Sequence, residues 1–170
     1  ENNELKQRWI ENKNWSYRTT FEVDSLNLSS QRNSLKFDGL DTYANVFLND
    51  TLILTANNMF RSWEVQVQDL LHLGTNELRI ELESPVLHNK AAVENYPYRL
   101  PSGNESADVE TKVSNFTRKA AYQFGWDFGP RFVTSGIWKP IELVDWNYAR
   151  ILNVYTYTKS IKDNLAFMET

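Results

Sequence analysis

The residues whose types and spacing could do chemistry gather in the segment QFGWDFGPR, with Asp127 at its centre. Trp126 and Phe128 flank this carboxylate, and a glycine follows on either side. An ionised carboxylate among apolar side chains costs desolvation energy unless a partner compensates for it. The segment therefore raises the question of what Asp127 binds.

A sugar is one candidate partner. Sugar sites combine aromatic faces, which cover the C–H faces of the ring, with fixed polar groups that bind its hydroxyls. Gly125 and Gly129 allow a tight turn that brings Asp127 to a loop tip. In an extended chain, the side chains of residues i and i+2 point to the same side. We therefore expect Trp126 and Phe128 on one side, excluding water, and Asp127 on the other.

A structural interpretation competes with this one. Trp126 and Phe128 would then be core residues, and Asp127 would pair with Arg118 or Arg131 inside a turn. The residue types alone leave both interpretations open.

Composition narrows the classes of partner. The 170 residues carry a net charge of −4, which disfavours binding to nucleic acid or to an anionic membrane. No apolar run approaches the roughly 20 residues of a membrane-spanning helix. The absence of cysteine excludes disulfides and thiolate chemistry. His72 and His88 are isolated and no His/acid cluster has metal-ligand spacing, so we expect neither metal nor cofactor.

The elements that must position Asp127 are short strands with apolar residues at every second position. Within 42–55, Asn49-Asp50 supplies turn residues that tolerate positive φ. Many short strands joined by turns predict an all-β, antiparallel β-sandwich. The predicted strands cover 17–23, 34–40, the two halves of 42–55, 60–67, 76–83, 137–146 and 151–158.

Two stretches depart from this pattern. Residues 84–95 predict a short helix, with Ser84 as N-cap and Pro85 at its first position. The following 96–117 reads as a long irregular connection, a kind of loop that is often functional. After residue 147 the final strands have nothing to pair with, which indicates the beginning of a second domain.

Several motifs together carry a family resemblance. The stretches RKAAYQFGWDFGPR and TSGIWKPIEL resemble the R-K-A…G-W-D-W-G-P-R…G-I-W-R-P-V segment of β-mannosidases in glycoside hydrolase family 2. FDGLDTYANVFLND and NMFRSWEVQV are similar to two further elements of that family, in the same order. The resemblance covers roughly residues 15–146.

The resemblance implies an N-terminal sugar-binding domain, a jelly roll with a galactose-binding-like fold, over residues 1–147. Residues 148–170 would start a truncated immunoglobulin-like domain. In the family, two glutamates on a later (β/α)₈ barrel perform retaining hydrolysis of terminal β-mannose. This chain would be non-catalytic and inactive alone, meeting a β-mannoside oligosaccharide together with that barrel. The family favours a periplasmic, secreted or lysosome-like location.

By the same resemblance, Asp127 accepts hydrogen bonds from hydroxyls of the terminal mannose, and Trp126 shapes the same subsite. Phe128 stands where the family usually has tryptophan, which removes an indole N–H donor. The residues expected to support the loop are Phe128, Arg131, Arg118, Gly125 and Gly129.

Three alternatives remain at this point. A free-standing carbohydrate-binding module would need an aromatic platform, such as Trp9, Trp15 and Trp63 together. A purely structural sandwich domain would keep Asp127 buried and paired with an arginine. Another exo-glycosidase of the family, a β-galactosidase or β-glucuronidase, is the second choice of activity.

Overall fold

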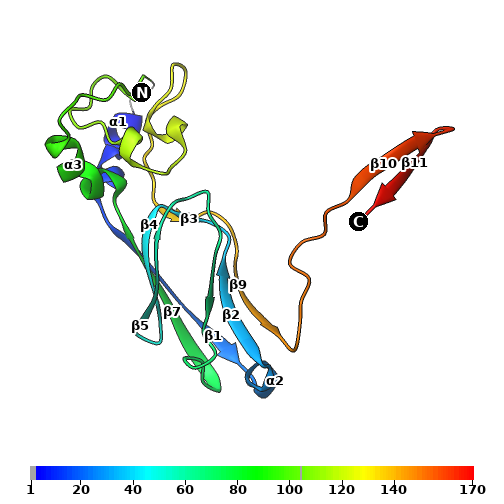
Figure 1. The fold of residues 1–170 in the computed structure, drawn as a ribbon. Coiled ribbons are helices and arrows are strands. Elements are labelled where there is room, and N and C mark those ends of the chain that lie inside the picture. Colours follow the sequence, from blue (N-terminus) through cyan, green and yellow to red (C-terminus); the bar gives the residue numbers. More distant parts are fainter. Residues whose placement is uncertain (1–2, 104) are drawn as a thin grey trace.

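The computed structural model describes residues 3–103 and 105–170, and two antiparallel sheets facing each other dominate it (Figure 1). The predicted antiparallel β-sandwich is confirmed. One sheet has the order β1 (Trp15–Val23), β7 (Gly74–Glu83), β4 (Tyr43–Leu48) and β5 (Thr51–Asn57). The other has the order β6 (Trp63–Gln66), β2 (Arg32–Phe37) and β9 (Ile141–Trp146). Two short strands, β3 (Leu40–Asp41) and β8 (Gly136–Ile137), pair with each other.

The core lies between the sheets and follows the alternation of the sequence. Phe37 on β2, Val46 and Leu48 on β4, and Ile80 and Leu82 on β7 are almost fully buried there. Successive strand residues point to opposite faces, so the polar residues between these positions face outward. Burial of each such apolar side chain stabilises the fold by about 1.5–3 kcal/mol.

The predicted helix is present as α3 (Pro85–Asn95), and the Ser84 hydroxyl accepts the N–H of Leu87 at 3.2 Å. The predicted turn is also present, with φ of 47° at Asn49 and 63° at Asp50.

Within the described ranges, no helix is long and apolar enough to cross a membrane. The sequence did not predict the short helices α1 (Asn3–Gln7), η1 (Arg8–Asn12), α2 (Ser25–Ser29), η2 (Ser114–Phe116) and η3 (Ala121–Phe124).

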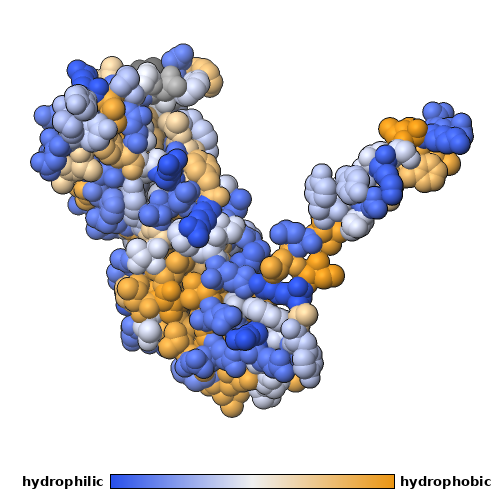
Figure 2. Space-filling view, viewed as in Figure 1, coloured by the Kyte–Doolittle hydropathy of each residue, from blue (hydrophilic) through white to orange (hydrophobic). Residues whose placement is uncertain are grey.

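The C-terminal segment differs from its prediction. Residues 151–156 contain no strand, and the first strand begins at Tyr157. The strands β10 (Tyr157–Lys162) and β11 (Leu165–Glu169) form a hairpin of their own. Figures 1 and 2 show this hairpin standing away from the sandwich at the end of an extended linker. The exposed apolar residues of 151–155 lack a facing sheet here, so periodicity alone did not make a strand of them.

A second, smaller core lies at the α3 end of the sandwich. Val113, Phe124 and Val133 are buried together, and Val86 and Val93 of α3 pack against them. This cluster holds the irregular connection and the segment that contains Asp127.

Arg131 crosses this second core with a buried guanidinium. Its Nε donates to Glu11 at 2.8 Å, and its Nη1 donates to Glu105 at 3.0 Å and to the carbonyl of Phe124 at 3.2 Å. The side chains of Arg131 and Glu105 are fully buried, and that of Glu11 nearly so. Glu105 also accepts the N–H groups of Val113 and Ser114. One arginine thus joins three segments that are far apart in sequence.

Replacing this arginine tests its role. We expect Arg131→Met to lower the free energy of unfolding by about 3–5 kcal/mol, because two buried carboxylates lose their cationic partner. Urea unfolding followed by tryptophan fluorescence measures the change.

The matched control is Lys90→Met, which removes an exposed i,i+4 pair with Glu94 from the surface of α3. We expect it to change the free energy of unfolding by no more than about 0.5 kcal/mol. Equal effects of the two substitutions would contradict the structural role of Arg131.

Candidate functional site

The segment around Asp127 forms a tight turn that ends in a loop tip. Trp126 N–H donates to the carbonyl of Gly129 at 3.2 Å, and Gly129 N–H donates to that of Trp126 at 3.3 Å. Asp127 and Phe128 are therefore the two central residues of a turn, and the expected extended chain is absent here. In Figure 1 this turn projects as the yellow-green loop beside the N-terminal end. Asp127 is exposed, and no side-chain hydrogen bond or ion pair joins it to the described residues.

The two glycines of the turn differ in their conformation. Gly125 ends η3 with φ 116° and ψ 158°, which side chains rarely adopt, so glycine is needed there. Gly129 has no such φ, and a Cβ on it would meet only Trp126 Cβ, at an ordinary 3.6 Å. The local backbone therefore requires glycine at position 125 but not at position 129.

The aromatic residues form one wall of an open hollow. The rings of Trp126 and Phe128 lie edge to face, with centroids 6.3 Å apart. Phe128 is 89% exposed and Trp126 40%, so they do not shield Asp127 from water in this chain as the sequence suggested. The adjacent hollow of about 840 Å³ is mostly apolar, and Tyr122 and Phe132 line it with them. Asp127 lies beside the hollow, between two of its lining residues.

Lys119 and Arg131 anchor the loop that carries the tip. The Lys119 ammonium is buried, pairs with Asp41 of β3, and donates to the carbonyl of Thr134 at 2.7 Å. Gln123 adds a hydrogen bond to Asp41 at 3.3 Å and accepts one from the Thr134 hydroxyl. Burial lowers the pKa of Lys119 below its ordinary value, while the Asp41 carboxylate acts in the opposite direction. These bonds close both ends of the loop 119–134 onto the sandwich.

Neither arginine pairs with Asp127. Arg131 is committed to Glu11 and Glu105 in the second core. Arg118 is exposed, and its carbonyl accepts the N–H of Met59 at 3.0 Å. The sequence pattern indicates no role for Lys119, although this residue stands beside Arg118 in the quoted motif. Its burial depends on Asp41, 78 positions away, so no local pattern could reveal it.

The aromatic residues named for an alternative platform are separated by the fold. Trp9 and Trp15 lie near each other, with ring centroids 6.0 Å apart. Trp63 lies on β6 of the other sheet, where Arg61 covers its ring at 4.2 Å. The three tryptophans therefore do not form one surface.

The arrangement at the tip can recognise a ligand by hydrogen bonding and apolar contact. The exposed carboxylate of Asp127 accepts hydrogen bonds from hydroxyl groups, and the aromatic wall can pack on C–H faces. Across residues 3–103 and 105–170, no three His, Cys, Asp or Glu side chains gather in a way that could hold a metal ion. The tip thus offers a ligand a hydrogen-bond acceptor beside an apolar surface.

Comparisons with known proteins agree with the fold. Residues 1–139 match the family model described as glycosyl hydrolase 2 galactose-binding domain-like. A β-mannosidase B from Thermothelomyces thermophilus is 37% identical over 163 residues, which cover 94% of this chain and 18% of that protein. A β-mannosidase from Mus musculus is 35% identical over 154 residues, 88% of this chain and 17% of that protein.

A solved structure is similar over nearly the whole chain. The crystal structure of a β-D-mannosidase from Dictyoglomus thermophilum matches with a TM-score of 0.85 and 42% identity, covering 95% of this chain and 19% of that one. This chain thus spans less than a fifth of the length of these relatives. The chain belongs to the galactose-binding-like domain family of glycosyl hydrolase family 2, in the form found at the N-terminus of β-mannosidases.

Proposed function

We propose that this chain is the non-catalytic N-terminal domain of a retaining exo-β-mannosidase, and that its tip at 126–129 completes the sugar pocket. The catalytic glutamates would lie on a (β/α)₈ barrel further along the full-length chain, where a pair of carboxyl groups performs retaining hydrolysis. The similarity to β-mannosidases over nine-tenths of this chain, and their much greater length, support the proposal.

The exposed carboxylate of Asp127, unpaired within the described part of the chain, is the observation that carries the role of the tip. A carboxylate with a purely structural task would be paired with an arginine, and the nearby Arg131 is instead engaged elsewhere. Asp127 can therefore accept hydrogen bonds from two hydroxyls of a terminal mannose at no cost to the fold. Such bonds to a charged acceptor are about twice as strong as neutral ones.

The aromatic wall would contribute apolar contact and water exclusion only when the barrel is in place. Phe128 and Trp126 are too exposed to exclude water from Asp127 in this chain. A barrel face seated on the hollow would bury both rings and strengthen the electrostatic contact of Asp127 with the sugar.

By the same proposal, residues 148–170 begin the second, immunoglobulin-like domain.

The first prediction concerns the 170-residue chain by itself. We expect the purified chain to release no aglycone from an aryl β-mannoside, because the residues that do the chemistry lie outside it. A chromogenic assay against a buffer blank measures the release of aglycone. Hydrolysis that still accompanies the chain after further purification would contradict the proposal.

The second prediction concerns the full-length enzyme. We expect Asp127→Ala to lower kcat/KM on an aryl β-mannoside by about 10²-fold or more, because a charged contact that strengthens in the transition state is lost. Steady-state kinetics measure the change, and thermal unfolding verifies that the variant is folded.

Asp69→Ala provides the control, since Asp69 is another exposed turn carboxylate, between β6 and β7 and away from the tip. We expect its kinetics to match those of the unmodified enzyme. Unaltered kinetics in Asp127→Ala would remove the tip from the sugar pocket while leaving the family assignment intact.

A further inference from the structure

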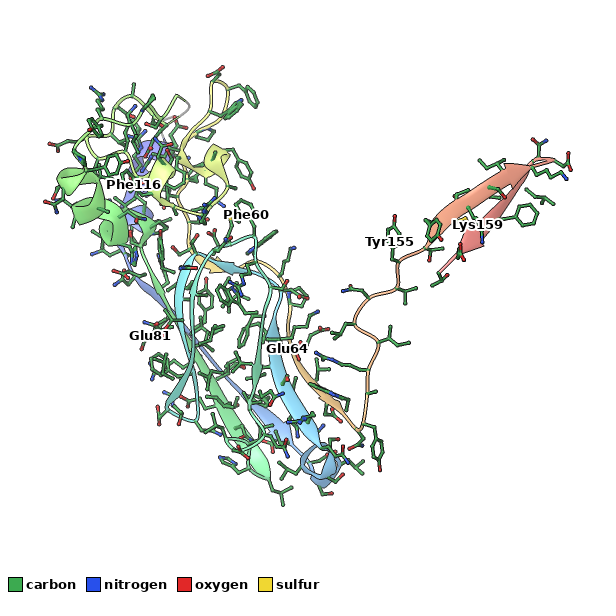
Figure 3. The ribbon with its side chains drawn as sticks, in the orientation of Figure 1. Phe60, Glu64, Glu81, Phe116, Tyr155 and Lys159 are labelled. Atoms are coloured by element: carbon green, nitrogen blue, oxygen red, sulfur yellow. The ribbon has the colours of Figure 1, made fainter. Side chains whose placement is uncertain are left out.

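A cleft of about 710 Å³ lies on the outer face of the four-stranded sheet, away from the tip at 126–129. Its floor is formed by β1, β7, β4 and β5, and Asn14 and His88 stand at its α3 end. Figure 3 labels Glu81 on this outer side, whereas Glu64 belongs to the opposite sheet. Neither the family assignment nor the proposed role of Asp127 uses this cleft.

The strand register makes the floor a grid of polar side chains. Ser16, Glu81, Asn45 and Thr55 stand directly opposite one another and form one row across all four strands. Glu83, Tyr43 and Asn57 form the next row across three of them. Cross-strand neighbours have Cβ atoms about 4.5–5.5 Å apart, so hydrogen-bonding groups repeat at short, regular intervals.

The groups in the first row are suited to hydroxyls. The Thr55 hydroxyl donates to Asn45 Oδ1 at 2.9 Å, which orients the Asn45 carboxamide. The N–H groups of that carboxamide make no hydrogen bond to the part of the chain that the structure describes. Glu81, exposed beside it, supplies acceptor oxygens. A fixed donor thus stands next to an acceptor, as a hydroxyl requires.

One wall of the cleft is flat and rigidly held. The His88 ring stacks on the Tyr43 ring, with centroids 3.7 Å apart and an interplanar angle of 15°. His88 Nδ1 lies 2.7 Å from Glu83 Oε2, and the Tyr43 hydroxyl donates to the carbonyl of Phe116 and accepts from Asn89. The partly exposed imidazole therefore presents a fixed planar surface, on which the C–H face of a sugar ring can pack.

The charges of the cleft favour a neutral ligand. Glu81 and Glu83 disfavour an anion, and each already faces a basic partner, Arg79 and His88 respectively. No set of three potential metal ligands stands here or elsewhere in the described residues. An apolar ligand would leave the amides and hydroxyls of the floor without partners.

We propose that this cleft binds a neutral oligosaccharide, as a second sugar site separate from the tip. The ligand lies across β7, β4 and β5, with its hydroxyls on Asn45 and Glu81 and one ring face against His88. The site does not depend on the downstream barrel, because all of these residues belong to this chain.

Titration calorimetry of the 170-residue chain with β-1,4-linked mannotetraose, and with cellotetraose as a second neutral sugar, tests the proposal. We expect saturable binding of at least one of them. Asn45→Ala and Glu81→Ala should each raise Kd by about fivefold or more, because a hydrogen-bonding group is lost from the floor. Both residues are exposed, and unchanged thermal midpoints would show that both variants are folded.

Thr20→Ala is the matched control, because Thr20 lies on the same outer face of β1 but opposite Glu77, beyond the cleft. It should bind as the unmodified chain does. The proposal is overturned if neither sugar binds, or if neither Asn45→Ala nor Glu81→Ala changes the Kd. If the Asp127→Ala variant lost binding and the Asn45→Ala variant kept it, the sugar would be bound at the tip. That result would also overturn the proposal of a sugar site in the cleft.

Discussion

The exposed tip depends on a charge that is completely buried. A guanidinium in a protein interior is costly unless carboxylates and hydrogen bonds compensate for it. Two carboxylates compensate for Arg131: Glu11 from η1 and Glu105 from the long connection. These contacts fix the chain on the C-terminal side of the turn, while Gly125 and Lys119 determine its path on the other side. The turn of four residues can then project into solvent, held by the hydrogen bonds between Trp126 and Gly129 and by the anchors on either side.

The tip and the cleft differ in chemistry because they arise in different ways. The hollow at the tip is lined by aromatic residues that a loop holds away from any core, and surfaces of this kind are usually interaction sites. The cleft is polar because the outward-facing residues of the strands line it, while the residues that alternate with them build the sandwich core. Val46 and Ile80 point inward, so Asn45 and Glu81 beside them must point outward. One face of the sheet makes the fold, and the other offers hydrogen bonds.

The relatives provide the context in which both surfaces make sense. A chain that spans less than a fifth of its relatives would meet further domains in a full-length protein. An aromatic tip is suited to contact with such a domain, since burying Phe128 and Trp126 removes apolar area from water. A polar cleft gains nothing from being covered in that way. Under the two proposals the surfaces would therefore take different partners: protein and sugar together at the tip, and sugar alone at the cleft.

The sequence by itself determined the sandwich, the helix at Pro85–Asn95 and the turn at Asn49, because these depend on local periodicity, capping and turn chemistry. Its motifs, in their order along the chain, indicated the family by resemblance. It also located the tip, since its glycines and aromatics are adjacent in the chain. Only the tertiary structure decided that Arg131 pairs with Glu11 and Glu105, and that Asp127 has no side-chain partner among residues 3–103 and 105–170. It likewise showed that Lys119 anchors the loop, and that residues on four strands form one cleft. Each of these depends on contacts between positions tens of residues apart, which no local pattern records.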